Sequence, residues 1–230
     1  MRKLGLVGGV GPEATLMYYQ GITYGVKRRV GRDFFPRLSV ESLSCFDVIP
    51  MSAAGKKAEL AEYFLSALES LAAGGAEFGA LACCTGHLVF EELERRSPIP
   101  LVSIVEVTAE AAKRAGAKRV GLLGTQATME EDFFKKPFIE RGIEVAVPNG
   151  PERRWVADKI LSELENGLVK PETVEGFMKL AKTLAERDGI EALVLGCTEL
   201  PMVFSRFEPP VAALDAAAIH IEALADAILA

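Results

Sequence analysis

Short apolar segments alternate along the chain with longer stretches in which hydrophobic residues recur every three or four positions. The short segments are typical of buried strands and the longer ones of helices that cover a sheet. The pattern predicts strands at residues 3–9, 37–42, 78–83, 101–103, 119–124, 143–147, 192–196 and 211–213. It predicts helices at residues 12–29, 56–73, 105–115, 152–166, 171–188 and 216–229. This alternation favours an α/β fold with mostly parallel sheets flanked by helices.

The two halves of the chain resemble each other weakly. KLGLVGGVGPEAT is similar to RVGLLGTQATMEE, since each reads as a strand, a turn of small residues and the threonine-bearing start of a helix. Later in each half a strand runs into a cysteine, and 75 residues separate Gly8 from Cys83 while 73 separate Gly124 from Cys197. The repeat predicts two pseudo-symmetric domains. Because ligands of parallel sheets bind outside the carboxyl ends of the strands, we expect an active site in a cleft between the domains, with one thiol on each wall.

Cys83 and Cys197 are therefore the first candidates for catalysis. A single buried cysteine is usually a small hydrophobic residue, and this structural interpretation stays open for either one alone. As a matched pair at strand ends they favour chemistry, because backbone N–H groups at a helix start lower the pKa of a thiol and stabilise anions. Two thiols on opposite sides of a small ligand could remove a proton from one face and return one to the other, as racemisation requires.

Cys84 leaves an ambiguity in this assignment. Aligning the halves on their shared Cys-Thr pair matches Cys84, rather than Cys83, with Cys197. Only one of two neighbours in an alternating strand can point into the cleft, so the residues alone do not decide between them. The vicinal pair could also indicate a metal or redox site. No Cys-x-x-Cys motif or histidine cluster supports zinc, and we expect no metal.

The glycine turn after the first strand has two interpretations. Gly9, Gly11 and Ala14 loosely match the dinucleotide fingerprint, with Glu41 placed to bind the ribose. Alternatively, Pro12 at the first helical position makes a tight turn whose helix N-terminal amides bind a small anion such as a carboxylate. We favour the small anion.

Histidine and acidic side chains near the cysteines are further candidates. His87 comes about one helical turn after Cys83 and could orient a thiol, although a lone histidine is more often structural. We expect His220 to pack in the C-terminal helix. Glu199, two residues after Cys197, is either a partner of that thiol or an ordinary first-turn acid.

Composition and charge argue against several classes of protein. The 230 residues carry a net charge of −6, with a pI of about 5.2, so nucleic acid and anionic membranes are poor partners. We find neither a signal peptide nor an apolar run of about eighteen residues that would span a membrane. Four cysteines do not make a disulfide framework at this length, so reduced thiols in a cytoplasmic protein are expected.

Five motifs together resemble the aspartate/glutamate racemase family, the cofactor-independent amino-acid racemases. They are GLVGGVGPEAT, ACCTGH, GLLGTQATMEEDFF, GCTE and LDAAAIH, which follow the family's order over nearly the whole chain. The resemblance implies that Cys83 and Cys197 are the two catalytic cysteines. It also implies that His87 and Glu199 support these cysteines without binding the substrate themselves. It also implies that no cofactor is needed and that the protein is a homodimer.

The resemblance further implies a domain division and a set of substrate contacts. One domain would comprise residues 1–100 and 212–230, with a returning C-terminal helix, and the other residues 101–211. Threonines would hold the α-carboxylate of the substrate near the glycine turn, and a lysine in ELENGLVK would bind substrate unless it is merely an exposed charge at a helix end. The expected substrate-binding residues are Gly9, Gly11, Cys84, Thr85, Thr125, Lys170 and Thr198.

Two departures from the family pattern concern substrate binding. Cys84 stands where the family has an asparagine, which puts a weak hydrogen-bond donor in place of an amide. The loop SCFDVIPMSAAGKK lacks the arginine that family members use for an acidic side chain, and Ala53 and Ala54 stand there instead. Lys56 or Lys57 in this loop, or Lys170, could substitute only as a point charge without bidentate geometry.

The sequence therefore predicts a cofactor-independent amino-acid racemase, with aspartate or glutamate as the expected substrate. Two alternatives remain at this stage. One is an isomerase or decarboxylase of a small dicarboxylate on the same fold. The other is a non-catalytic protein that binds a small ligand or a dinucleotide through the glycine turn.

Overall fold

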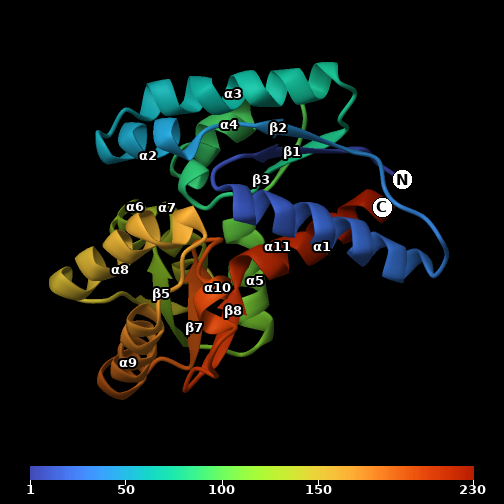
Figure 1. Cartoon of the computed structure of the whole chain (residues 1–230). Coiled ribbons are helices and arrows are strands. Elements are labelled where there is room, and N and C mark those ends of the chain that lie inside the picture. Colours follow the sequence, from blue (N-terminus) through green and yellow to red (C-terminus); the bar gives the residue numbers. More distant parts are fainter. The chain divides into compact units, whose positions relative to one another are not determined.

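Two compact units make up the chain in the computed structural model, which describes all residues from Met1 to Ala230. The first unit comprises Met1–Ile104 and Ala217–Ala230, and the second comprises Val105–Ala216. Each contains a four-stranded sheet, ordered β2-β1-β3-β4 in the first unit and β6-β5-β7-β8 in the second (Figure 1). The predicted α/β fold is confirmed, and the matching strand orders are the structural form of the sequence repeat.

Every predicted strand is present, and all neighbouring strands pair in parallel. The strands are β1 (Leu4–Gly8), β2 (Leu38–Ser42), β3 (Phe78–Leu81), β4 (Leu101–Val102), β5 (Arg119–Gly124), β6 (Glu144–Ala146), β7 (Ala192–Gly196) and β8 (Ala212–Asp215). Because β4 belongs to the first sheet and β8 to the second, the units divide after residues 104 and 216, a few positions later than the sequence indicated.

The helices are more numerous than the hydrophobic pattern predicts. Those expected are α1 (Pro12–Val30), α3 (Lys57–Ala73), α5 (Ile104–Arg114), α8 (Gly150–Ser162), α9 (Pro171–Asp188) and α11 (Ala216–Leu229). The additional ones are α2 (Cys45–Ala53), α4 (Phe90–Arg96), α6 (Gln126–Glu130), α7 (Asp132–Ile139) and α10 (Pro201–Phe204), with the 3₁₀ turns η1 (Thr85–Val89) and η2 (Leu164–Asn166). None of the helices combines the length and the apolar character needed to cross a membrane.

Two hydrophobic clusters cover the two faces of the first sheet. On one face, Phe64 and its neighbours on α3 pack against Leu81 of β3. On the other face, Tyr18 of α1 and Leu224 of α11 pack with Phe78. Figure 1 shows this sheet between α2, α3 and α4 on one side and α1 and α11 on the other. The C-terminal helix is thus part of the core of the first unit.

A buried hydrogen-bond chain fastens α11 to this core. The hydroxyl of Tyr18 lies 2.9 Å from Nδ1 of His220, and Nε2 of His220 lies 3.1 Å from the carbonyl oxygen of Val102. A carbonyl oxygen can only accept, so Nε2 carries the proton and Nδ1 accepts from the tyrosine. Burial lowers the pKa of His220 to about 3, which keeps the ring neutral. His220 has the packing role expected of it.

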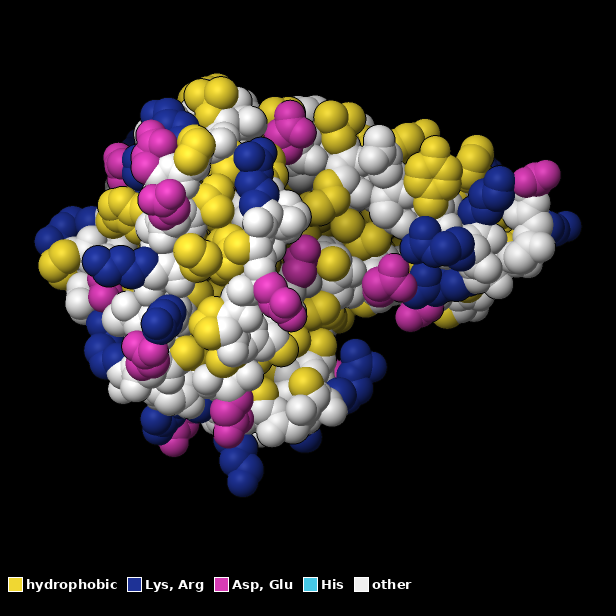
Figure 2. Space-filling view, turned by 60° about the horizontal axis from the view of Figure 1, so that its bottom comes forward, with side chains coloured by type: hydrophobic (Ala, Val, Ile, Leu, Met, Phe, Trp, Pro, Cys, Tyr) yellow, Lys and Arg dark blue, Asp and Glu magenta, His cyan; other side chains and the backbone are white.

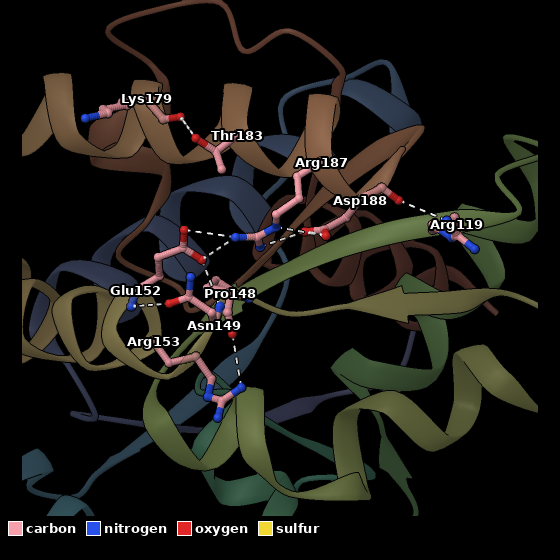
Figure 3. A network of polar contacts seen from close by, with 9 residues as sticks. All are labelled: Arg119, Pro148, Asn149, Glu152, Arg153, Lys179, Thr183, Arg187 and Asp188. Atoms are coloured by element: carbon pink, nitrogen blue, oxygen red, sulfur yellow. Dashed lines mark hydrogen bonds and ion pairs between the residues drawn. The ribbon is translucent and has the colours of Figure 1, made fainter.

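A polar network ties α8, α9 and β5 together on the second unit (Figure 3). Asn149 and Glu152 form a capping box at the start of α8, each side chain accepting from the backbone N–H of the other residue. Glu152 also accepts from Arg187 near the end of α9 at 3.1 Å. The backbone carbonyl of Asp188 accepts in turn from Arg119 of β5 at 3.0 Å. The network joins the start of α8 to the end of α9 and, through Asp188, to the first residue of β5.

We predict that Tyr18→Phe lowers the free energy of unfolding of the protein by about 1–3 kcal/mol, because Nδ1 of His220 then loses a buried partner. Urea denaturation at neutral pH measures this change. Tyr19→Phe is the matched control, since Tyr19 is 51% exposed and its substitution should change stability by less than about 0.5 kcal/mol. Equal losses in the two variants would contradict the assigned role of the hydrogen bond.

Candidate active site

The candidate residues follow the carboxyl ends of the two central strands in each unit. In the first unit, Leu81 of β3 pairs with Val7 of β1. In the second, Leu195 of β7 pairs with Leu123 of β5. Val7 and Leu123 each precede the glycine that ends a central strand, so these two pairs are equivalent. A cysteine comes two residues after the paired leucine in both units.

This register distinguishes Cys83 from its neighbour. Cys83 and Cys197 are the residues two positions beyond the paired leucines, and each is 4% exposed. Both pack into the hydrophobic cluster that covers the corresponding face of their own sheet. Cys84 is equally buried but lies one position further along. Strand pairing therefore favours Cys83, rather than Cys84, as the counterpart of Cys197.

The glycine turn after β1 has a fixed and crowded geometry. Gly9 has a φ of 81°, and a Cβ placed there would lie 2.0 Å from the carbonyl oxygen of Leu43, so only glycine fits. Its N–H donates to the hydroxyl of Thr15 at 2.8 Å, and that hydroxyl donates to the carbonyl of Gly11 at 3.0 Å. No side chain caps the start of α1. Its first-turn amides can therefore serve an anion.

His87 holds the backbone at Cys83 rather than the thiol. Its Nδ1 lies 3.1 Å from the carbonyl oxygen of Cys83, and its Nε2 accepts from the N–H of Ile104 at 3.2 Å. The ring stacks on Phe90 with 4.6 Å between centroids. Burial lowers the pKa of His87 to about 4, so the ring is neutral with both nitrogens engaged. It positions the start of η1, where Thr85 is also buried.

Cys197 has a carboxylate as its direct partner. Its Sγ donates to Oε2 of Glu199 at 3.0 Å, and the hydroxyl of Thr198 donates to the same oxygen at 2.9 Å. All three residues are buried, with Glu199 only 2% exposed. Burial and the neighbouring carboxylates raise the pKa of the Cys197 thiol. The resting group is therefore a thiol hydrogen-bonded to a base.

Glu165 is a member of this cluster that the sequence did not reveal. One donor atom from each of Glu165, Cys197 and Glu199 lies within 4.8 Å of the others. Burial, together with the charge of Glu199, raises the pKa of Glu165 to about 8. The carboxyl of Glu165 therefore carries a proton at neutral pH. The three donors are close enough together to hold a metal ion.

The pKa of Glu163, two residues before Glu165, is shifted in the opposite direction. It is buried, and hydrogen bonds from Lys159 at 2.6 Å and Thr173 at 2.5 Å lower its pKa to about 2. Nζ of Lys170 lies 3.5 Å from the same carboxylate, while the lysine side chain is 53% exposed. Lys170, the expected substrate-binding lysine, is therefore a partner of Glu163 at the start of α9.

The remaining candidates are Thr125 and the residues of the loop without an arginine. Thr125 caps α6, and its Oγ1 lies 3.0 Å from Oγ1 of Thr128. In the loop without an arginine, Ala53 ends α2 and Lys56 forms an exposed ion pair with Glu59 at 2.9 Å. The threonine hydroxyls thus have partners within their own unit, and Lys56 is held by a neighbouring acid.

Comparison with known proteins gives consistent matches. The family described as Asp/Glu/Hydantoin racemase matches residues 7–224. A candidate Asp/Glu racemase of known structure from Yersinia pestis is 31% identical, with full coverage of both chains and a TM-score of 0.89. An aspartate racemase homologue from Pyrococcus horikoshii OT3 is 35% identical over the full length of both chains, with a TM-score of 0.81. The broad specificity amino-acid racemase RacX of Bacillus subtilis is 22% identical over 94% of this chain and 93% of its own.

The proton on Glu165 leads to a prediction about how the stability of the protein depends on pH. The pKa of Glu165 is raised on folding, so the group stabilises the protein at low pH and loses that contribution as the pH rises toward and through about 8. We expect Glu165→Gln to melt at a higher temperature than wild type, and by a larger margin at pH 9 than at pH 6, because the carboxyl of the unfolded chain has an ordinary pKa of 4.5 and is already ionised at pH 6. Calorimetry at the two pH values measures the difference.

Glu175→Gln is the control for this experiment, because Glu175 is an exposed carboxylate in the same unit. Its difference from wild type should be the same at both pH values. A Glu165→Gln difference that does not change between pH 6 and pH 9 would show that Glu165 holds no proton in the folded protein.

Proposed function

Because the chain belongs to the Asp/Glu/hydantoin racemase family and is an isomerase of the amino-acid racemase class, we propose that it racemises aspartate or glutamate with two thiols. Cys83 and Cys197 are the proposed acid–base groups. The observation that carries this proposal is their equivalence, since each follows by two residues the leucine paired to a central strand. A duplicated site with one matched thiol per unit suits a reaction that needs one acid–base group for each face of a carbon.

The proposed reaction moves one proton at each face of the substrate. One thiolate takes the proton from Cα, which leaves a carbanion-like species flattened by its carboxylate. The other thiol gives a proton to the opposite face, which produces the other enantiomer. The first cysteine is then a thiol and the second a thiolate, so the reverse reaction uses the same two groups in exchanged roles. The proposal requires both sulfur atoms to reach one substrate molecule.

Glu199 supplies a route for the proton of Cys197. Its Oε2 already accepts the S–H hydrogen bond at 3.0 Å, so a short transfer would leave a thiolate ready to act as base. Glu165 then matters because its proton removes one negative charge from the surroundings of the thiol. With both carboxylates ionised, a neighbouring thiolate would be strongly disfavoured.

The proposed carboxylate site lies at the turn after β1. The α-hydrogen of an amino acid is weakly acidic, so the carboxylate must be stabilised as negative charge spreads onto it. First-turn amides of α1 are the groups best placed to do so, since no side chain caps them. The hydroxyl of Thr198 now donates to Glu199, so it binds substrate only by rotating away from that carboxylate.

The substrate's second carboxylate is the part of the proposal that relies on relatives. Related proteins are described as an aspartate racemase homologue and a glutamate racemase. In this chain Lys170 is the proposed cation, and it would have to exchange Glu163 for the substrate. A neutral amino acid as substrate would leave that ion pair intact.

We predict that proton exchange in D2O separates the two thiols. The wild type should replace the α-proton of both enantiomers of aspartate or glutamate and racemise them. Cys83→Ala and Cys197→Ala should each lose racemisation by about 10²–10⁴-fold. Each variant should still exchange the α-proton of one enantiomer, and not the same one, because a single thiol serves one face. NMR on each enantiomer separately, beside a panel of neutral amino acids, gives these rates and the substrate together.

Cys45→Ala is the matched control, because Cys45 is buried in α2 within the core of the first unit. It should retain racemisation. Loss of activity in Cys84→Ala with retention in Cys83→Ala would reverse the assignment of the first thiol. Wild-type protein that exchanges no α-proton, but converts a small dicarboxylic acid, would support the isomerase or decarboxylase alternative.

A further inference from the structure

The two histidines of the chain contact the same short backbone segment, residues 102–104. Nε2 of His220 lies 3.1 Å from the carbonyl oxygen of Val102, and Nε2 of His87 accepts from the N–H of Ile104 at 3.2 Å. Both rings are buried, and the face of the molecule in Figure 2 shows basic, acidic and hydrophobic side chains but no histidine. The segment is therefore held at both of its ends by buried side chains.

The hydrogen bonds assign opposite tautomers to the two rings. A carbonyl oxygen only accepts and a backbone N–H only donates, so His220 carries its proton on Nε2, whereas His87 carries it on Nδ1. That Nδ1 lies 3.1 Å from the carbonyl oxygen of Cys83, and the hydroxyl of Tyr18 donates to Nδ1 of His220 at 2.9 Å. Burial lowers the pKa of both rings and keeps them neutral. A buried series of hydrogen bonds thus leads from Tyr18 through residues 102–104 to the backbone at Cys83.

The same segment flanks the stretch that carries Cys83. Before the cysteine, Ala80 of β3 pairs with Val102 of β4. After the cysteine, His87 of η1 is bound to Ile104, the first residue of α5. Because β4 has only two residues and lies at the edge of its sheet, few ladder hydrogen bonds fix the segment. Its hydrogen bonds to side chains therefore contribute much to its position.

The thiol of Cys83 is in contact with the backbone of η1. A Cβ placed at Gly86 would lie 3.1 Å from Sγ of Cys83, which is closer than an ordinary van der Waals contact. His87 is the next residue, and its ring holds the carbonyl group of Cys83. Because protein interiors are closely packed, a small displacement of η1 would also displace the sulfur atom.

We propose that His220 is a positioning residue for the thiol of Cys83. Its hydrogen bonds go to Tyr18 and Val102, so it acts on the thiol through the segment and through His87. Cys197 belongs to the second unit, where its thiol is bound to a carboxylate, so its position depends on other groups. The inference rests on the proposed function, in which each thiol serves one face of the substrate.

Proton exchange in D2O on each enantiomer of aspartate or glutamate tests this role. We expect His220→Leu to racemise about 10- to 100-fold more slowly than wild type, because a small misplacement of an acid–base group lowers the rate steeply. Exchange of the enantiomer that Cys197 deprotonates should stay within about twofold of wild type, since one thiol serves each face. His220→Gln should recover most of the loss, because its amide N–H can still donate to Val102.

Leu224→Ala is the matched control, because Leu224 is buried on the same helix but its side chain cannot form hydrogen bonds. This variant should lose stability through the cavity it creates, yet racemise within about twofold of wild type. Circular dichroism confirms that each variant is folded at the assay temperature. If His220→Leu does not fold, Tyr18→Phe is the milder test, since it removes the donor that fixes the tautomer of His220. Its expected loss of racemisation is about threefold.

Alkylation by iodoacetamide, followed by mass spectrometry, tests the role without a substrate. Loss of the hydrogen bond to Val102 should loosen η1 and expose the neighbouring thiol. We therefore expect Cys83 to be alkylated at least about fivefold faster in His220→Leu than in wild type, while the rate at Cys197 stays unchanged. Leu224→Ala should leave the ratio of the two rates as it is in wild type.

Two results would overturn the inference. One is a loss of racemisation in Leu224→Ala as large as that in His220→Leu, which would make the effect one of general stability. The other is an unchanged ratio of alkylation rates in His220→Leu. A wild-type protein that exchanges no α-proton would contradict the proposed function instead, and the alkylation ratio would still decide whether His220 positions the thiol of Cys83.

Discussion

Parallel pairing of the central strands is the constraint on which the candidate site depends. A parallel ladder fixes which residues leave the sheet together, so the end of β1 and the end of β3 share one edge, as do the ends of β5 and β7. The same constraint carries the turn at Gly9 to the edge where Cys83 follows β3, and Thr125 to the edge where Cys197 follows β7. A slip of one residue in either ladder would turn the cysteine to the opposite face of its sheet. The glycines inside these strands protect the register, since a Cβ at Gly5 or Gly121 would come within 3.0 Å of a packed side chain.

Near Cys197, the hydrogen-bond donors around each glutamate determine whether its carboxyl group is charged. Glu163 and Glu165 lie two residues apart at η2, yet the pKa of one is lowered to about 2 and that of the other raised to about 8. The first accepts hydrogen bonds from a lysine and a threonine, whereas the second faces another carboxylate. Two like acids thus take different protonation states at neutral pH. One of them anchors Lys159 and Lys170, and the other limits the negative charge beside a thiol.

Much of this structure could be predicted from sequence because its strands are short, apolar and bounded by glycine. Two of the helices that were missed carry a local signal that conflicts with the outcome. Pro50 lies inside α2 and Pro137 inside α7, and proline argues against a helix interior unless neighbouring segments hold it there. The importance of Glu165 could not be foreseen either, since a single buried glutamate does not change the hydrophobic periodicity of the sequence. Cys83 could be chosen over Cys84 only by resemblance, because the distinction rests on strand register.

The discontinuity of the first unit has a consequence for how the chain is made. Its core needs Ile221, Leu224 and Ile228 of α11, and His220 joins that helix to Tyr18 and Val102. During synthesis, Met1–Ile104 therefore have one face of their sheet covered only by α1 until α11 has been made. Val105–Ala216 form a continuous segment that can complete their own core earlier. In the order of synthesis, the second unit is therefore the first able to finish folding, and a chain interrupted before α11 would be defective in its first unit.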